Sequence, residues 1–388
     1  MKDEDQKPAR YQGFEQGPIR PPSEAHSLLI RVTRNCPWNR CTFCPVYKEK
    51  RFSLRPVEHV IRDIDAVSKN VEHIKQLAHE TGSISRVQIR NMVKNETPAD
   101  VQALYAALNW AAGGMKSVFL QDANSLIIKP VDLIKILEHL MKCFPWVERI
   151  TSYARSHTLA RINDEHLKAM KNAGLNRIHI GLESGSDAVL ERVMKGVSKA
   201  TQVKAGIKVK KAGIELSEYV MPGLGGQELS EVHAHETADA LNQIDADFIR
   251  LRTLAIPNTV PLYAEHRDGR FKKCTDLMMA KEILNFIEKL DGITSTIKSD
   301  HILNLFQDVE GKLPDDKPKM LKTIRSFLAM EPRRRTIYQI GRRLGIFSGL
   351  SDMQSAQRIK KAEQACRDLG ITPENVDDVV DELMKRFI

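Results

Sequence analysis

Short apolar segments alternate along this chain with longer stretches in which apolar residues recur at helical spacing. The short segments predict strands over Leu28–Thr33, Ser117–Gln121, Arg149–Tyr153, Asn176–Leu182, Ile214–Met221 and Asp247–Thr253. The longer stretches between them predict helices over Pro98–Ala112, Pro130–Phe144, Asn163–Ala173 and Thr201–Ala212. Strands and helices that alternate in this way predict an α/β fold with a parallel sheet and right-handed crossovers. Six such units predict a partial (β/α)6 barrel.

Outside these units the pattern changes. Residues 1–26 are rich in proline, glycine and charge, and predict an irregular N-terminal arm. The segment from Val57 to Val93 predicts a long helix followed by a further, extended piece. Beyond residue 268 the strand signal fades, and helices are predicted over Leu277–Leu290, Ser299–Val309, Lys317–Met330, Ser351–Leu369 and Val376–Phe387. We therefore expect three parts: an arm over residues 1–26, a barrel over 27–268 and a helical C-terminal subdomain over 269–388.

Polar side chains share one face of several predicted strands. In each of these strands polar and apolar residues alternate. Tyr153 and Arg155 fall on the polar side of one strand, and Glu183 falls on that of the next. Arg250 and Arg252 share the polar side of a third. If the apolar faces pack on the surrounding helices, the polar faces converge on the barrel interior. Such groups are costly to bury without partners, so a polar ligand is expected there. The arginines are suited to binding carboxylates, and internal salt bridges are the alternative interpretation.

Composition and charge narrow the class of protein. The 388 residues are 42% hydrophobic and 28% charged, which is typical of a globular protein. The sequence has no apolar run long enough to span a membrane and no secretory signal at its N-terminus, so a cytoplasmic protein is expected. The net charge of +9 suits either a well-solvated surface or an anionic partner. Residues 333–343, with five arginines and no acidic residue, predict a helical basic surface.

The cysteines point to a metal site rather than to disulfides. Cys36, Cys41 and Cys44 follow the first predicted strand directly, at the edge of the sheet where parallel barrels place their active sites. Iron–sulfur clusters are held by cysteine thiolates, and three ligands would leave one iron open. Structural zinc is the alternative, but it needs four ligands, and His26 and His59 lack the spacing to complete a site. The isolated cysteines are interpreted as core or surface thiols: Cys143, Cys274 and Cys366.

The cysteine segment resembles the signature of the radical S-adenosylmethionine (radical SAM) superfamily. The usual signature is C-x3-C-x2-C with an aromatic residue before the last cysteine, whereas this chain has C-x4-C-x2-C with Phe43 in the aromatic position. Two later turns, within Ile178–Asp187 and Val220–Glu228, resemble the G-[LV]-E-S-G and Gly-Leu-Pro-Gly-Glu turns of one branch. That branch contains oxygen-independent coproporphyrinogen oxidase, the methylthiotransferases and the elongator catalytic subunit. The resemblance covers about residues 25–265.

The resemblance implies a partial barrel of the radical SAM type and two cofactors. A 4Fe–4S cluster would be held by Cys36, Cys41 and Cys44, and S-adenosylmethionine would chelate the open iron. In this family Phe43 would lie near the adenine, and Asp122 would take the place of the usual Gly-Gly-Glu turn at the methionyl amine. The implied S-adenosylmethionine-binding residues are Phe43, Asp122, Tyr153, Arg155, Glu183, Ser184, Gly223 and Gly225.

The resemblance also implies the chemistry. One electron from the reduced cluster would cleave S-adenosylmethionine to methionine and a 5′-deoxyadenosyl radical, which would take a hydrogen atom from a small, anionic substrate. Arg250, Arg252 and His301 are the substrate candidates, His301 as an acid–base pair with Asp300 or as a structural residue. A flavodoxin- or ferredoxin-like protein would supply the electron.

Two alternatives stay open at this point. The sequence lacks a second cysteine cluster and a D-x-H-x-x-G motif, and its helical tail is short. These features argue against sulfur insertion, cobalamin chemistry and an elongator-type acetyltransferase. An RNA-modifying radical SAM enzyme would use the basic segment and bind in a salt-dependent way. A non-catalytic iron–sulfur sensor would hold the cluster without cleaving S-adenosylmethionine.

Overall fold

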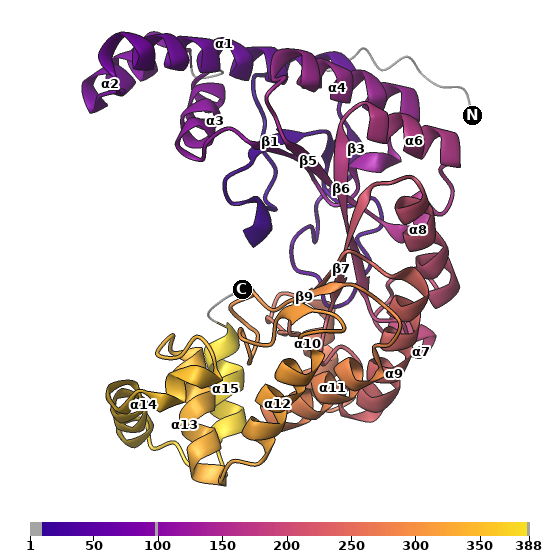
Figure 1. Cartoon of the computed structure of the whole chain (residues 1–388), viewed down its shortest axis with the longest axis vertical. Helices are drawn as coiled ribbons and strands as arrows, with labels where there is room; N and C mark the ends of the chain where they lie inside the picture. Colours follow the sequence, from indigo (N-terminus) through magenta and orange to yellow (C-terminus); the bar gives the residue numbers. More distant parts are fainter. Residues whose placement is uncertain (1–9, 98–99, 386–388) are drawn as a thin grey trace. The chain divides into compact units, whose positions relative to one another are not determined.

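The computed structural model describes residues 10–97 and 100–385, and its contacts divide the chain into two compact units (Figure 1). The first unit comprises residues 1–37, 49–179 and 212–214, and the second comprises residues 38–48, 180–211 and 215–388. The predicted helix from Pro98 begins at Val101, and residues 98 and 99 lie outside the described residues. The same holds for residues 1–9 of the predicted arm and for the end of the last predicted helix.

The described strands form an eight-stranded sheet in the order β1-β4-β5-β6-β7-β8-β9-β10. Strand β6 continues from the first unit into the second. The pairs β1–β4, β4–β5, β7–β8 and β8–β9 are parallel, and β9–β10 is antiparallel. The strands are β1 Leu28–Arg31, β4 Ser117–Gln121, β5 Arg149–Ala154, β6 Leu175–Glu183, β7 Glu215–Val220, β8 Phe248–Leu251, β9 Thr296–Lys298 and β10 Gly311–Lys312. The six predicted strands are all present in chain order, so the predicted fold class is confirmed.

The first unit builds its core where apolar strand positions meet the helices. Leu28, Ile30, Val118 and Ile150 are buried, and α1 packs against both α3 and α4 (Figure 1). Besides its strands, the unit contains η1 Pro22–Glu24, β2 Thr33–Arg34, β3 Ser53–Leu54, α1 Val57–Thr81, α2 Arg86–Asn95, α3 Val101–Ala112, η2 Ser125–Ile127, α4 Pro130–Cys143, α5 Ser156–Leu159 and α6 Asp164–Asn172.

Two expectations for the first unit are corrected. The piece after the long helix is helix α2 rather than an extended segment, because Ser85 and Gln88 form a capping box that starts it. The predicted strand Leu28–Thr33 ends at Arg31, and Thr33 and Arg34 form a separate strand, β2. Strand β2 pairs antiparallel with β3, so the two strands bracket the cysteine segment at its beginning and end.

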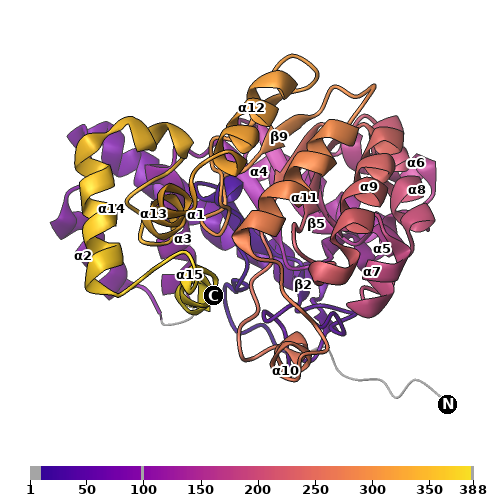
Figure 2. The ribbon, with the colours of Figure 1, turned by 90° about the horizontal axis from the view of Figure 1, so that it is seen from below.

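The second unit continues the parallel pattern with β7, β8 and β9. Helices α9 and α11 pack against each other, and α8 packs against α9 (Figure 2). Its helices are α7 Asp187–Arg192, α8 Lys199–Lys211, α9 Gly226–Ile244, α10 Pro261–Arg267, α11 Asp276–Lys289, α12 Lys317–Leu328, α13 Pro332–Arg343, η3 Leu350–Gln354, α14 Ala356–Asp368 and α15 Val376–Met384.

The predicted helix Ser299–Val309 is wrong. Strand β9 lies just before it, and the segment itself is irregular. Buried Asn304 explains the difference, because its side chain accepts a hydrogen bond from the backbone of Thr253 at 2.9 Å and donates one to Leu251 at 2.8 Å. These bonds tie the segment to the end of β8 and replace the backbone bonds that a helix would make.

The predicted basic surface over residues 333–343 is partly wrong. Helix α13 forms there, but Arg342 and Arg343 are buried. Arg342 donates hydrogen bonds to the backbone oxygens of three residues, and Arg343 forms an ion pair with Asp276 at 2.6 Å. Arg333 and Arg334 remain exposed. Two of the five arginines therefore stabilise the interior and do not contribute to a surface for a nucleic acid.

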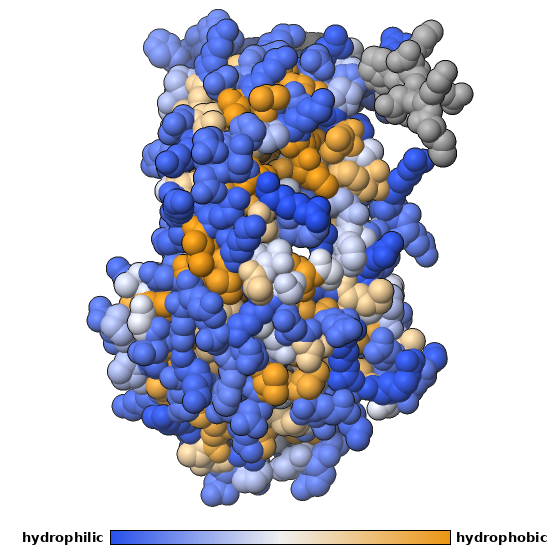
Figure 3. Space-filling view, turned by 90° about the vertical axis from the view of Figure 1, so that its right-hand side faces the viewer, coloured by the Kyte–Doolittle hydropathy of each residue, from blue (hydrophilic) through white to orange (hydrophobic). Residues whose placement is uncertain are grey.

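The surface is mostly hydrophilic on the face drawn in Figure 3, where apolar residues gather only in small groups. Within the described residues, the helices are too short or too polar for any of them to cross a bilayer.

Candidate functional site

The cysteine segment of the second unit is held by its backbone. The N–H of Thr42 donates to the oxygen of Val193 at 3.0 Å, and the oxygen of Thr42 accepts from the N–H of Leu262 at 3.0 Å. The Lys48 ammonium donates to the oxygen of Cys41 at 2.8 Å. The Cys41 and Cys44 side chains, both partly exposed, pack against a buried apolar cluster that includes Phe43. The two thiols are thus held in place while they stay accessible.

Trp38 fixes the beginning of this segment in the second unit. Its indole Nε1–H donates to the backbone oxygen of Met194 at 2.7 Å. Its ring lies directly against Gly196, where an added Cβ would come within 2.2 Å of a ring carbon. Gly196 also has a φ of +70°, which an L side chain rarely adopts. The four residues between Cys36 and Cys41 thus include Trp38, which contacts the backbone of Met194 and Gly196, the two neighbours of Lys195.

Lys195 forms an ion pair with Glu183, which the sequence predicted as a cofactor residue. The Lys195 Nζ lies 3.1 Å from Glu183 Oε1, and the two side chains are 13% and 14% exposed. The pair covers Gly181, where a Cβ would lie 2.3 Å from Glu183 Oε1. The Lys195 Nζ is also 5.9 Å from the centre of the Phe43 ring. Sequence reasoning missed Lys195, although it stands in a short Met-Lys-Gly segment soon after the Glu183 turn.

Glu218 is a second residue that the sequence analysis missed. Its side chain is fully buried, and neither carboxyl oxygen has a hydrogen-bond partner among the described residues. Burial raises the pKa of Glu218 well above its usual range, against the opposing effect of Lys195. Burial thus favours the uncharged form of Glu218. No local pattern points to Glu218, because it stands between Ser217 and Tyr219 on a strand with ordinary alternation.

Ser184 and Gly223 hold the two predicted turns of the second unit. The Ser184 hydroxyl lies 2.8 Å from His233 Nδ1 and accepts from the N–H of Ser186 at 3.0 Å. The N–H of Gly223 donates to the buried Glu282 carboxyl at 2.6 Å. Gly223 has a φ of +86°, and a Cβ there would lie 2.5 Å from the Met279 methyl group. Both residues thus shape the backbone of the turns.

Gly225 lies within the second turn and precedes helix α9 as its N-cap residue. A Cβ at Gly225 would come within 2.8 Å of the backbone oxygen of Leu229, so glycine is required for this close approach.

Asp122 lies in the first unit, beside the residue that precedes Cys36. Its buried carboxylate accepts from the backbone N–H of Asn35 at 2.9 Å and forms an ion pair with Arg31 at 2.8 Å. Glu15 of the N-terminal arm binds Arg31 from another side at 2.6 Å. Asp122 therefore positions the start of the cysteine segment, and its predicted contact with a ligand stays a prediction.

Tyr153 lies near the end of β5 in the first unit, and Arg155 follows the last residue of that strand. The Tyr153 ring packs against Phe119 and His179, with 5.4 Å between ring centres in each case. The backbone N–H of Arg155 donates to the side chain of Asn124 at 3.0 Å. The structure thus brings Tyr153 into an aromatic group and leaves the predicted role of Arg155 open.

The substrate candidates lie together in the second unit but differ in their partners. Arg250 is buried, donates to Ser217 at 3.2 Å and forms an ion pair with Asp300 at 3.0 Å. Arg252 is exposed and has no ion pair among the described residues. Burial, assisted by the positive charge of Arg252, lowers the pKa of His301 to about 4. His301 is therefore neutral at pH 7, and Asp300 pairs with Arg250 rather than with it.

The three isolated cysteines differ in exposure. Cys274 and Cys366 are buried, whereas Cys143 is partly exposed. Burial raises the pKa of the Cys274 thiol to about 12.

A comparison with protein-family models identifies one family. The model of the family described as "Radical SAM superfamily" matches residues 30–237. Two curated proteins are similar to part of the chain. The 4′-phospho-dehydrooxetanocin synthase of Priestia megaterium is 27% identical over 195 residues, which is 49% of this chain. An uncharacterized methyltransferase of Pyrococcus horikoshii is 28% identical over 106 residues, or 27% of the chain. The matched region covers only 22% of the length of each relative.

Among solved structures, coproporphyrinogen III oxidase of Escherichia coli aligns with 68% of this chain and 52% of its own. The alignment has a TM-score of 0.45 and 12% sequence identity. The archaeal Elp3 of Methanocaldococcus infernus aligns with 48% of each chain, with a TM-score of 0.37 and 15% identity.

Proposed function

The chain belongs to the radical SAM superfamily, and on that premise we propose that it is a radical SAM enzyme acting on a small, anionic substrate. The observation that carries the proposal is the anchored cysteine segment beside the Lys195–Glu183 pair. The whole activity is a proposal, because the relatives are matched over a small part of their length.

The cysteine segment fits a cluster of the kind that the family implies. We propose that Cys36, Cys41 and Cys44 hold a 4Fe–4S cluster with one open iron. In support, Cys41 and Cys44 are partly exposed, and their backbone is tied by Thr42 to residues on both sides. Cys36 follows Asn35, whose N–H is held by Asp122. Within each unit the backbone next to the ligands is therefore held by hydrogen bonds, which reduces the cost of ordering them when a metal binds.

The Lys195–Glu183 pair fits the amino-acid end of S-adenosylmethionine. An ammonium and a carboxylate side by side complement an α-carboxylate and an α-ammonium group, which carry the opposite charges in the same spacing. Gly181 leaves room above the strand for the pair. We assign Lys195 to the methionyl carboxylate and Glu183 to the methionyl ammonium, with Phe43 beside them. This assignment adds Lys195 to the residues expected from the sequence.

A cluster held by Cys36, Cys41 and Cys44 would supply the electron for reductive cleavage of S-adenosylmethionine, and the resulting radical chemistry would act on the substrate. The residues of this chain bind and orient the two small molecules. A flavodoxin- or ferredoxin-like protein is proposed as the electron donor.

Arg252 is the better candidate for the substrate anion. Arg250 already binds Asp300, so a substrate carboxylate or phosphate would have to displace an existing partner. Arg252 is exposed and lies close enough to His301 to lower its pKa. Neutral His301 is a hydrogen-bonding group without charge, and its Nδ1 accepts from the N–H of Leu303 at 3.2 Å. The protonated Nε2 would then donate to the same anion.

The proposal is tested by anaerobic reconstitution with iron and sulfide, followed by metal analysis and electron paramagnetic resonance of the reduced protein. We expect four irons per chain and a cluster signal that changes when S-adenosylmethionine is added. Cys44→Ala should lose the signal, and Cys366→Ala should keep it because this cysteine is buried on α14. Zinc in place of iron would refute the proposal. A cluster signal that does not change when S-adenosylmethionine is added would favour a non-catalytic iron–sulfur sensor.

A further inference from the structure

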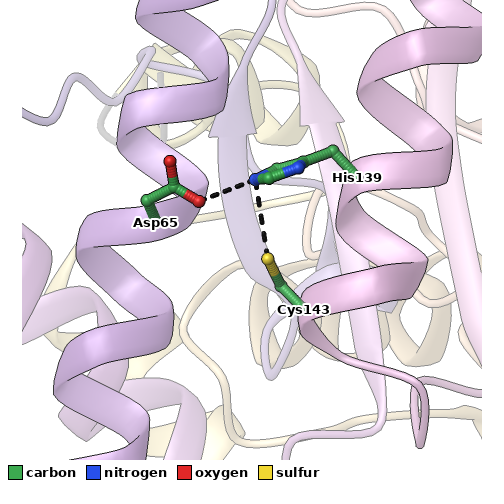
Figure 4. A group of neighbouring side chains, drawn as sticks. All are labelled: Asp65, His139 and Cys143. Atoms are coloured by element: carbon green, nitrogen blue, oxygen red, sulfur yellow. Dashed lines mark hydrogen bonds and ion pairs between the residues drawn. The ribbon is translucent and has the colours of Figure 1, made fainter.

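A separate group of metal-binding side chains lies between two helices of the first unit. Asp65 projects from α1, and His139 and Cys143 project from α4, which packs alongside it (Figure 4). His139 and Cys143 are four residues apart, so they lie on one face of their helix. The cysteine motif does not use these residues, and each of the three carries a different kind of metal-ligating atom.

The three ligand atoms converge on a small volume. His139 Nε2 lies 2.7 Å from Asp65 Oδ1 and 3.5 Å from Cys143 Sγ, and all three atoms lie within 4.8 Å of one another. In a tetrahedral zinc site with bonds of about 2.0–2.3 Å, the ligand atoms are separated by roughly 3.3–3.6 Å. The nitrogen–sulfur distance already has this value. Asp65 is 55% exposed, so its carboxylate can move outward by the few tenths of an ångström that a metal would require.

Both neighbours approach the same ring nitrogen of His139. Figure 4 shows the two contacts meeting at His139 Nε2. A neutral imidazole nitrogen carries either a proton or a lone pair. If Nε2 carries the proton, it is shared between the Asp65 carboxylate and the Cys143 sulfur, a weak acceptor that also interacts with Ser68. A cation at the point of convergence would satisfy the nitrogen, the oxygen and the sulfur together.

We propose that Asp65, His139 and Cys143 form a zinc site that links α1 to α4. Thiolate, imidazole and carboxylate are the three ligand types of protein zinc, and a mixed set of one each favours a borderline divalent ion over Mg²⁺ or Ca²⁺. Water completes the fourth position on the exposed side. Binding releases the thiol proton and any proton on Nε2 to solvent, and neither the metal nor the sulfur changes oxidation state. The bound zinc stabilises the packing of α1 against α4 in the first unit. It takes no part in the proposed radical chemistry.

The test uses Co²⁺ as a spectroscopic substitute for zinc in the full chain. The Cys36→Ala/Cys41→Ala/Cys44→Ala variant is titrated, so that the motif cysteines cannot contribute. We expect one equivalent of Co²⁺ to give the intense visible bands of a tetrahedral ion together with a thiolate-to-cobalt charge-transfer band, and one equivalent of Zn²⁺ to displace it. Adding Cys143→Ser should abolish the charge-transfer band. Adding His139→Gln should weaken binding at least tenfold.

The control is Cys274→Ser, which removes a buried cysteine of the second unit and should leave the cobalt spectrum unchanged. As a second readout, Zn²⁺ should raise the thermal unfolding temperature of the otherwise unaltered chain but not that of its Cys143→Ser variant. The proposal is overturned if the spectrum is absent or octahedral, or if it survives Cys143→Ser. It is equally overturned if Zn²⁺ shifts the unfolding of both proteins alike. None of these outcomes bears on the assay for cleavage of S-adenosylmethionine.

Discussion

Gly196→Ala should loosen the cysteine segment by displacing Trp38. The substitution has two separable costs. A φ of +70° is unfavourable for alanine by about 1–2 kcal/mol. In addition, the new Cβ would lie 2.2 Å from the Trp38 ring, which real contacts essentially never show, so the ring must move.

The second cost can be worked out from what the moving ring gives up. Trp38 loses its 2.7 Å hydrogen bond to Met194, a net contribution of about 1 kcal/mol. It also loses the contact with the Arg40 guanidinium 5.2 Å above its ring, which adds about 0.5 kcal/mol. The total for Gly196→Ala is then about 3 kcal/mol.

Gly292→Ala is the matched control. Gly292 has a φ of +68° and no atom within 4 Å of an added Cβ, so it carries the backbone cost alone, about 1–2 kcal/mol. Denaturant unfolding of the two variants measures the difference, and iron content after reconstitution measures the effect on the cluster. We expect Gly196→Ala to lose more stability by about 1–2 kcal/mol and to retain several-fold less iron. Equal losses of stability and equal iron contents would refute the role assigned to Trp38.

Three further predictions concern the second unit. Lys195→Ala should weaken S-adenosylmethionine binding by about tenfold, measured by calorimetry on the reconstituted protein, whereas Lys195→Arg should retain most of it; equal affinities would exclude the proposed contact. His301 has a folded-state pKa of about 4 against 6.5 when unfolded, so its contribution to stability is complete above pH 6.5 and is lost as the pH falls towards 4. His301→Gln should therefore reduce the loss of unfolding free energy between pH 6.5 and pH 4 by roughly 2–3 kcal/mol, and an unchanged slope would contradict this. In the cluster-free protein a thiol reagent should label Cys41 rapidly at pH 8 and Cys274, with its pKa of about 12, only on unfolding, as peptide mass spectrometry would show.

Local patterns predicted the six strands β1 and β4 to β8 well, because each strand needs only apolar residues at the right period and a glycine or loop to end it. They missed the three-residue strand β9, which pairs parallel with β8. Ser117–Gln121 has the predicted bounds, and the others differ at either end by up to two residues. The helix predicted over 299–309 failed for a non-local reason. Asn304 is held by the end of β8, about fifty residues earlier in the chain, and periodicity contains no information about such a bond.

The candidate site shows the same division between local and non-local information. The cysteine spacing and Phe43 are local, so the sequence displayed them. Lys195 was missed because its importance comes from pairing with Glu183 across Gly181 and not from its neighbours in sequence. For the basic segment over residues 333–343 the error was the opposite, because local charge predicted a surface that is partly interior. Arg342 and Arg343 are charged, but they are buried against backbone oxygens and Asp276. A count of charges cannot tell a buried, paired arginine from an exposed one.

The central claim is that this chain cleaves S-adenosylmethionine with an electron from a cluster on Cys36, Cys41 and Cys44. The most direct measurement is the amount of 5′-deoxyadenosine formed by the reconstituted, reduced protein under anaerobic conditions, compared with a Cys41→Ala variant and a Cys274→Ala control. We expect product from the unaltered chain and from the control, and none from Cys41→Ala. A protein that holds four irons, binds S-adenosylmethionine and forms no 5′-deoxyadenosine would contradict it.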